Sequence, residues 1–294
     1  MKVVRSKSEL REALEAPRRQ GKRIGLVPTM GYFHEGHLAL MSAAREDCDV
    51  VVVSLFVNPT QFGPGEDLES YPHDERRDVQ LAEREGVDLI WIPEKDQIYP
   101  EGFSTTVEVA SEFTGVLEGD PAQRGPSHFR GVTTIVAKLF NSVQPDVAYL
   151  GRKDAQQALV IRRMTEDLDF PVEIRVLPTV RGKGGLAMSS RNAYLSPEER
   201  DRALAISRAL RAAERLAGEG ETSTEALVEA ARAELRGADI EPEYVEARSA
   251  EDLSPVAELN GRPVLVAVAA RVGKARLIDN VVIDPPSANQ PTEA

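Results

Sequence analysis

Short apolar runs alternate with amphipathic stretches through the first two-thirds of the chain. Apolar and β-branched runs predict strands at 23–28, 50–57, 87–92, 147–150 and 172–177. Apolar positions at helical spacing predict helices between them, at 37–47, 74–85, 133–143 and 156–167. The run Val50–Val57 is almost wholly apolar, which is typical of a strand covered on both faces. Strands that alternate with helices in this way predict βαβ units and a parallel sheet.

The pattern changes after residue 195. Ser196, Pro197 and Glu199 form a helix-start signal, because Ser can cap the helix, Pro fits its first turn and Glu can complete a capping box. Two helices are expected at 198–217 and 222–236, followed by strands at 244–247, 263–270 and 275–283. The predicted fold is α/β. A Rossmann-like parallel sheet with helices on both faces occupies 1–177, a smaller α+β C-terminal domain occupies 178–284, and 285–294 is a disordered tail.

Composition and charge narrow the class of function. The 294 residues include 36 Lys and Arg against 48 Asp and Glu, a net charge of -12, which disfavours nucleic-acid binding through the whole surface. The one cysteine, Cys48, excludes an internal disulfide framework and a Cys-rich zinc site, and its place beside an apolar run indicates a buried thiol. No secretory signal is recognisable, and the apolar runs fall short of the roughly 20 residues of a membrane span. We therefore expect a cytoplasmic protein with neither a nucleic-acid nor a membrane partner.

A pair of histidines follows the first of these predicted strands. The strand ends at Pro28, a glycine-containing loop follows, and His34, Gly36 and His37 open the next helix. A helix N-terminus presents unpaired N–H groups and a positive dipole end to phosphate, and histidines three positions apart lie on one face. Gly36 would let a nucleotide approach the backbone closely. Two surface histidines or a pair of metal ligands are the alternatives, but the strand–loop–helix context favours a nucleotide site.

A second segment with phosphate-binding chemistry spans 181–192. Its three glycines between 182 and 185 predict a flexible loop. Ser189 and Ser190 supply hydroxyl donors, and Arg191 supplies a planar cation suited to phosphate oxygens. An inter-domain linker is the alternative, and the position after a strand end favours a functional loop.

The motif His34-x-Gly36-His37 resembles the signature of the class I adenylating superfamily, which includes nucleotidylyltransferases and class I aminoacyl-tRNA synthetases. Further motifs are similar, in order and spacing, to those of the pantothenate synthetase (pantoate–β-alanine ligase) family. They are Phe56–Phe62, His128–Val132, Lys138–Asn141, Gly151–Gln157, Pro178–Arg181 and Met188–Asn192. This resemblance is strong over 21–195 and weaker over 196–283.

The resemblance implies that ATP lies between the histidine motif and the 181–192 loop, which closes over it as part of a lid domain, and that Mg²⁺ accompanies ATP. The implied catalytic residues are His34, His37, Lys153, Ser189, Ser190 and Arg191. The implied ATP-binding residues are Pro28, Thr29, Met30, Gly31, His34, Gly36, His37, Gly151, Arg152, Lys153, Asp154, Val180, Met188, Ser189, Ser190 and Arg191. Pantoate is assigned to Asn58, Gln61, His128, Arg130 and Gln157, and Mg²⁺ to Asp78.

Simpler interpretations stay open for some of these residues. Gln61 after Asn-Pro is also explained as turn chemistry, Lys153-Asp154 as a solvated helix start, and Asp78 as an exposed helix residue. The chain also departs from the family, which usually has Arg at His73, Glu at Arg152 and Tyr at Ala155. The stretch 182–185 lacks the family's acidic residues, which predicts a looser and more cationic loop.

The activity implied by the resemblance is ATP-dependent condensation of pantoate with β-alanine through a pantoyl adenylate, by a homodimer. Another nucleotidylyltransferase of the superfamily is one alternative, and a nucleotide-binding module without enzymatic activity is another. An aminoacyl-tRNA synthetase is disfavoured by the short chain and its acidic balance.

Overall fold

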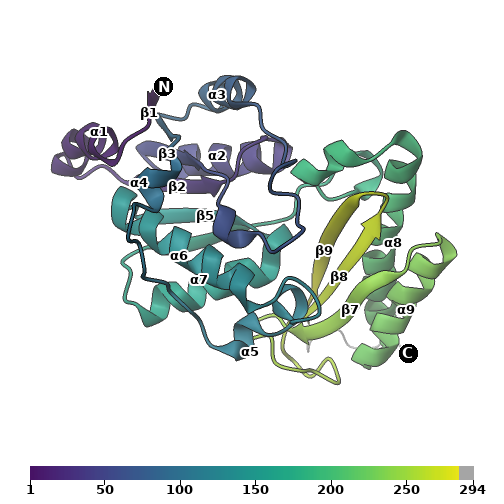
Figure 1. The fold of residues 1–294 in the computed structure, drawn as a ribbon. Helices are drawn as coiled ribbons and strands as arrows, with labels where there is room; N and C mark the ends of the chain where they lie inside the picture. The colour runs from purple at the N-terminus through teal and green to yellow at the C-terminus, as the bar shows by residue number, and fades with distance from the viewer. Residues whose placement is uncertain (285–294) are drawn as a thin grey trace. The chain divides into compact units, whose positions relative to one another are not determined.

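The computed structural model describes residues 1–284, which divide by their contacts into two compact units (Figure 1). Unit 1 comprises Met1–Val180 and Met188–Ala193, and unit 2 comprises Arg181–Ala187 and the described chain from Tyr194 onward. We predicted one boundary near residue 177, and the chain passes between the units after Val180, Ala187 and Ala193. The segment 181–192 is therefore shared between the units. The tail predicted to be disordered, 285–294, lies outside the described residues.

Unit 1 contains the predicted parallel sheet, with strands in the order β1-β4-β3-β2-β5-β6 and every neighbouring pair parallel. Its strands are β1 (Lys2–Val4), β2 (Ile24–Thr29), β3 (Val50–Leu55), β4 (Leu89–Trp91), β5 (Val147–Gly151) and β6 (Glu173–Leu177). Its helices are α1 (Lys7–Arg19), α2 (Glu35–Asp47), α3 (Glu75–Arg84), α4 (Lys95–Ile98), α5 (Ser111–Thr114), α6 (Pro126–Val143) and α7 (Ala155–Asp167). Short 3₁₀ turns are η1 (Pro59–Gln61), η2 (Leu117–Gly119), η3 (Arg152–Asp154) and η5 (Ser190–Tyr194), of which only Tyr194 belongs to unit 2.

Strand β3 explains why the sheet is covered on both faces. Val50 and Val52 pack into one apolar cluster with side chains of α1, α6 and α7, whereas Val51 and Val53 pack into a second cluster with side chains of α2 and α3. Successive strand residues point to opposite faces, so a strand that is apolar at every position needs helices on both sides. The predicted Rossmann-like α/β arrangement is confirmed, and Cys48 is buried as expected.

Two differences from the predicted elements have local causes. Strand β1 and helix α1 were not predicted, although Ser6 caps α1 and forms a capping box with Glu9. Helix α6 begins at Pro126, which suits the first turn of a helix, rather than near 133. The prediction missed this start because polar residues in the first turns interrupt the apolar pattern.

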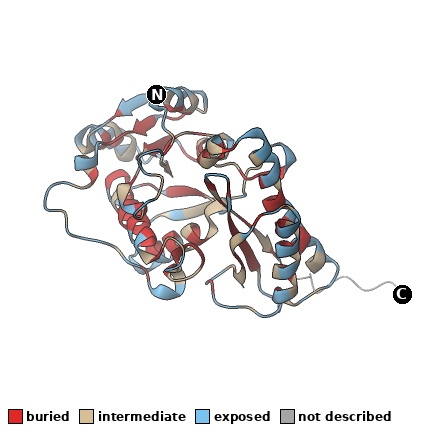
Figure 2. Cartoon of the chain, turned by 45° about the vertical axis from the view of Figure 1, so that its right-hand side comes forward, coloured by how far each residue is buried: buried red, intermediate tan, exposed pale blue. Residues whose placement is uncertain are grey.

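Unit 2 pairs two helices with a small antiparallel sheet, ordered β7-β8-β9. Its elements are η4 (Lys183–Gly185), α8 (Pro197–Gly218), α9 (Thr224–Gly237), β7 (Pro242–Ser249), β8 (Val264–Val272) and β9 (Ala275–Ile283). The Ser196 side chain accepts the Glu199 N–H in the predicted capping box. Strands in both units carry mostly the buried colour in Figure 2. Among residues 1–284, none of the helices combines the length and apolar character that crossing a membrane requires.

Candidate functional site

The predicted site residues follow the carboxyl ends of neighbouring strands in unit 1. Strands β3 and β4 continue the sheet on one side of β2, whereas β5 and β6 continue it on the other. The strand order thus reverses between β2 and β5, and ligands of open α/β sheets bind at such a switch point. The chain after β2 carries Met30–His37, and the chain after β5 carries the η3 turn with Lys153 and Asp154. The predicted site residues therefore follow the two strands that flank the switch point, where ligands of open α/β sheets bind.

His34 and His37 cap helix α2 reciprocally. His34 is the N-cap residue, and its Nδ1 accepts the Gly36 N–H at 3.1 Å. The His34 N–H points to Nδ1 of His37 at 3.4 Å, and the two rings stack with centroids 4.1 Å apart. A Cβ on Gly36 would lie 2.9 Å from Cε1 of His34, so glycine is required for this ring position. The cap geometry thus gives a second reason for glycine at position 36, beside the predicted close approach of a nucleotide.

These caps determine which ring nitrogens carry protons. A backbone N–H can only donate, so Nδ1 of both rings must be unprotonated and Nε2 must carry the hydrogen. Burial, with help from Lys153, lowers the pKa of His34 to about 4. Burial, together with His34 and Lys153, holds the pKa of His37 well below its usual range. Both rings are neutral Nε2–H donors near pH 7.

The loop in front of the histidines is fixed from below by Asp78 on α3. Its carboxylate accepts the N–H groups of Tyr32 and Phe33 at 2.6 and 2.7 Å, and the residue is only 1% exposed. Burial raises the pKa of Asp78, and the two amide bonds oppose that shift. Gly31 has φ +87°, and a Cβ there would lie 3.1 Å from Oδ2 of Asp78. The family resemblance assigned Asp78 to Mg²⁺; in the structure both of its carboxylate oxygens accept backbone N–H groups.

Lys153 supplies the positive charge near the histidines. It lies in η3 after β5, its ammonium group is 3.5 Å from Oδ1 of Asp154, and it depresses the pKa of both His34 and His37. Two neutral N–H donors and one ammonium group therefore face one region. This is a donor set suited to phosphate oxygens.

The second half of the 181–192 segment lies against the histidine loop. The Met188 N–H donates to the carbonyl oxygen of Val180 at 2.9 Å, and the Ser190 hydroxyl donates to that of Tyr32 at 3.4 Å. A Cβ on Gly36 would lie 3.7 Å from Cβ of Met188. The two segments that the sequence predicts to approach one ligand are thus neighbours within unit 1.

Arg191, at the end of this segment, is held by a carboxylate that the sequence analysis did not single out. Its Nε and Nη2 donate to the two oxygens of Asp67 at 2.9 and 2.8 Å, and its guanidinium carbon lies 5.8 Å from the ring centroid of Tyr71. The Arg191 N–H also donates to the Ser189 hydroxyl at 3.3 Å. Arg191 and the Ser189 and Ser190 hydroxyls thus all take part in hydrogen bonds within unit 1.

The first half of the segment is built into unit 2. Arg181 and Ala187 form a β-bridge, and Arg181 pairs with both oxygens of Asp279 at 2.6 and 3.0 Å. Gly185 has φ +102°, and a Cβ there would lie 2.0 Å from Nη2 of Arg211. We predicted flexibility from the glycines; in the structure Gly185 is packed against Arg211 and Ser207, and its positive φ disfavours a larger residue.

Three of the residues assigned to pantoate meet around η1 and the start of α6. Asn58 is fully buried, and its amide donates to Oε1 of Gln61 at 2.9 Å and to the carbonyl oxygen of Gly131 at 3.1 Å. Its own oxygen accepts the Tyr99 hydroxyl at 2.8 Å, which fixes the orientation of the amide. Gln61 therefore turns its oxygen to Asn58 and keeps its NH₂ group for another acceptor.

His128 supports this arrangement with both ring nitrogens. Nδ1 donates to the carbonyl oxygen of Gln61 at 2.8 Å, and Nε2 accepts from Nη1 of Arg124 at 3.2 Å. Burial and the Arg124 cation lower the pKa of His128 to about 4. Both ring nitrogens of His128 therefore bond protein groups, and the ring holds η1 in place through the Gln61 carbonyl oxygen.

The remaining assigned residues lie apart from that network. Arg130 is exposed and pairs with Glu108 at 2.9 Å. Gln157 lies partly buried on α7, while its neighbour Gln156 is buried and bonds the backbone at Phe113, Val116 and Glu118. The structure thus distinguishes two adjacent glutamines that the sequence presents alike.

The charged residues that sequence reasoning missed are Glu66, Asp67 and Arg124. Their partners are distant in sequence, and Gly63, Pro64 and Gly65 beside the two acids suggested only a turn. The one usable signal was Arg124 four positions before His128.

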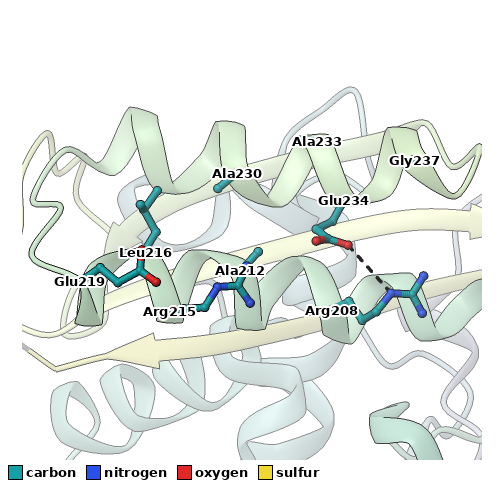
Figure 3. Close-up of a pocket in the computed structure, with 9 residues that line it drawn as sticks. All are labelled: Arg208, Ala212, Arg215, Leu216, Glu219, Ala230, Ala233, Glu234 and Gly237. Carbon is teal, nitrogen blue, oxygen red and sulfur yellow. Dashed lines mark ion pairs between the residues drawn. The ribbon is translucent and has the colours of Figure 1, made fainter.

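In the part of the chain that the structure describes, neither a cluster of metal-binding side chains nor the groove in unit 2 adds residues to the predicted site. Within the described chain, no group of three or more His, Cys, Asp or Glu side chains could hold a metal ion. A groove between α8 and α9 is lined by small side chains such as Ala212 and Ala230, and the ion pair Arg208–Glu234 (3.9 Å) crosses it (Figure 3). None of its lining residues belongs to the predicted site.

The chain matches one known protein family along almost its whole length. The family model described as pantoate-beta-alanine ligase matches residues 2–282. The chain is 53% identical to pantothenate synthetase 1 of Bradyrhizobium diazoefficiens over 96% of this chain and 98% of the relative. It is 50% identical to the pantothenate synthetase of Moorella thermoacetica over 97% and 99%.

Solved structures agree with the sequence matches. A pantothenate synthetase from Thermus thermophilus superposes with a TM-score of 0.89 at 47% identity, covering 96% of this chain and 99% of that one. A pantoate-beta-alanine ligase from Francisella tularensis, complexed with beta-gamma ATP and beta-alanine, superposes with a TM-score of 0.80 at 32% identity over 96% and 97%.

Proposed function

This chain belongs to the pantoate–β-alanine ligase family, and we propose that it joins pantoate to β-alanine at the expense of ATP. One observation supports the proposal above all. The His34–His37 cap, Lys153 and the Ser189–Arg191 segment converge at the switch point of the parallel sheet.

The reaction has two steps. A carboxylate acylates an amine poorly, so the pantoate carboxylate first attacks the α-phosphorus of ATP and expels pyrophosphate. The β-alanine amine then attacks the carbonyl carbon of pantoyl adenylate, forming the amide and releasing AMP. Both steps develop charge on phosphate oxygens, and donors already held in place stabilise it without reorganising.

The Nε2–H groups of His34 and His37 are such donors. Their caps hold the rings in one orientation, and neutrality lets them bind phosphate without a change of protonation. We assign the cationic part of the work to Lys153 and Arg191, and a hydroxyl contribution to Ser189 and Ser190. We assign pantoate to Gln61 and Gln157, with Asn58 and His128 orienting η1. The Gln61 NH₂ group suits an oxygen of a hydroxy acid.

The remaining assignments to ATP extend the same proposal. They are Gly36 in the first turn of α2 and, at the ends of β2, β5 and β6 and in the loops beyond them, Pro28, Thr29, Met30, Gly31, Gly151, Arg152, Asp154, Val180 and Met188. Homodimer formation and a cytoplasmic location are further proposals that rest on the family resemblance.

Mg²⁺ belongs to this proposal as the counter-ion of ATP. Bound to the phosphates, it would neutralise their charge, and Mg²⁺ normally keeps several waters and few protein ligands. Asp78 does not fit as its ligand, because the carboxylate is buried and holds two backbone amides. We therefore propose that Mg²⁺ enters with ATP.

Pyrophosphate release from ATP, Mg²⁺ and pantoate, measured with and without β-alanine, tests the proposal. We expect one equivalent of pyrophosphate without β-alanine and continuous turnover with it, with AMP and pantothenate appearing together. A product that retains the nucleotide would indicate another nucleotidylyltransferase. ATP binding without pyrophosphate release would indicate a binding module and would overturn the proposed reaction.

A further inference from the structure

Two adjacent carboxylates, Glu66 and Asp67, each hold an arginine from a different part of unit 1. Glu66 accepts Nε and Nη2 of Arg124 at 3.2 and 2.6 Å. Asp67 accepts Nε and Nη2 of Arg191 at 2.9 and 2.8 Å. Both pairs are bidentate, and a bidentate carboxylate fixes the plane of a guanidinium group as well as its position.

The Glu66 pair leads to the residues assigned to pantoate. Arg124 also donates to the carbonyl oxygen of Gln61 at 3.0 Å and to Nε2 of His128 at 3.2 Å. His128 in turn donates to that same carbonyl oxygen. The Arg124 side chain is only 14% exposed, so the position of η1 depends on a cation whose charge is balanced by Glu66.

The Asp67 pair leads to the residues assigned to ATP. Arg191 lies over the ring of buried Tyr71, and Ser190 beside it bonds the histidine loop. The bonds to Asp67 use two of the five N–H donors of Arg191, and both lie on the Nε–Nη2 edge of the guanidinium group. The Nη1 end is therefore directed away from Asp67, where an anion can receive its hydrogen bonds.

We propose, on the basis of the proposed function, that Glu66 and Asp67 are positioning residues with separate effects. Glu66 orients Arg124 and through it the pantoate-binding turn. Asp67 orients Arg191 toward the phosphates of ATP. An acidic pair on one short segment thus aligns the two substrate sites, although neither carboxylate contacts a substrate.

Equilibrium binding separates the two effects. Calorimetry measures the affinity for ATP, and then the affinity for pantoate in the presence of a non-hydrolysable ATP analogue. We expect D67N to weaken ATP binding about tenfold and to leave pantoate binding unchanged, since a hydrogen bond to a charged group is being weakened. E66Q should weaken pantoate binding by about the same factor and spare ATP. R124K, which loses the bidentate geometry, should reproduce E66Q.

The matched control is E69Q. Glu69 lies on the same segment and is exposed, so this variant makes the same charge change away from both arginines. It should bind both ligands as the wild type does. Thermal unfolding of every variant identifies any that has lost its fold, and for such a variant D67E or R124K supplies the corresponding measurement.

The proposal is overturned if D67N and E66Q weaken both ligands equally, as loss of a merely structural segment would, or if neither differs from E69Q. These outcomes are distinguishable from failure of the proposed function. A wild-type protein that binds ATP and pantoate but releases no pyrophosphate refutes the reaction, while the split in binding still decides the roles of Glu66 and Asp67.

Discussion

An arginine–aspartate pair stands at each end of the 181–192 segment, and the two pairs are used differently. Arg181 gives two hydrogen bonds to Asp279 and two more to the carbonyl oxygens of Gly185 and Asn280. Asp279 is only 3% exposed. Arg191 gives two hydrogen bonds to Asp67, and both side chains are 23% exposed.

A bidentate arginine–aspartate pair therefore does not by itself reveal the role of the arginine. The four terminal N–H donors of Arg181 have partners in unit 2, so that arginine is a structural clamp. Arg191 bonds Asp67 through Nε and Nη2 only, and in our proposal Asp67 directs the Nη1 donors toward a ligand. The count of donors already used, rather than the presence of an ion pair, separates an anchor from a binding group.

The largest effect should come from removing the aimed cation. R191A is expected to lower the rate of pantoate-dependent pyrophosphate release by roughly a hundred- to a thousandfold, the usual cost of losing one transition-state donor. The melting temperature should change little, because the Arg191–Asp67 pair is partly solvated. Initial rates at saturating ATP and pantoate measure the effect. Near-normal turnover by folded R191A would show that both pairs are structural.

Removing the clamp should instead act on stability. R181A leaves Asp279 buried without its cation, which should lower the free energy of unfolding by roughly 3–5 kcal/mol. The lower end is expected, since the Asn280 N–H still donates to Asp279 at 2.8 Å. Denaturant titration followed by circular dichroism measures the loss. R181K is the control, because it keeps the charge and should recover part of the stability. Wild-type stability of R181A would contradict the assignment.

The same pairs show how far sequence reasoning could go. The strand pattern of β3, the Ser196 cap and the histidines opening α2 were readable because each depends on residues within a few positions. Only the family resemblance distinguished Arg191 from Arg181, because the ion-pair partners that separate them, Asp67 and Asp279, lie 124 and 98 positions away. Asp78 likewise looked like a surface helix residue, because its bonds to Tyr32 and Phe33 are made by backbone amides that no side-chain pattern displays.

Acid should weaken the two units unequally. All four histidines of the sequence lie in unit 1, and burial lowers the pKa of His34 and His128 from 6.5 to about 4. Between these pH values the unfolded chain binds more protons than the folded chain, so the free energy of unfolding falls as the pH drops. We expect a loss on the order of a few kcal/mol between pH 7 and pH 5.

Trp91 reports this loss, because it is the one tryptophan of the sequence and is fully buried in unit 1. Denaturant unfolding followed by its fluorescence at the two pH values measures the effect. H128N, which removes one of the buried rings, should flatten the dependence. Equal stability of the wild type at pH 7 and pH 5 would contradict the neutral, buried state of these rings.

The smallest effect should come from Lys183, which adds a positive charge to the stretch 182–185 that the sequence predicts to be looser and more cationic. Lys183 is exposed and lies in the half of the segment that is fixed to unit 2 by Arg181 and Gly185. If only the Met188–Ala193 half presents groups to ATP, K183A should leave both the rate and the affinity for ATP at wild-type values. K153A is the matched lysine control and should lose at least about a hundredfold in rate. Weaker ATP binding by K183A, with the fold intact, would show that the unit 2 half also reaches the nucleotide, and the division between anchor and binding group would then fail at this segment.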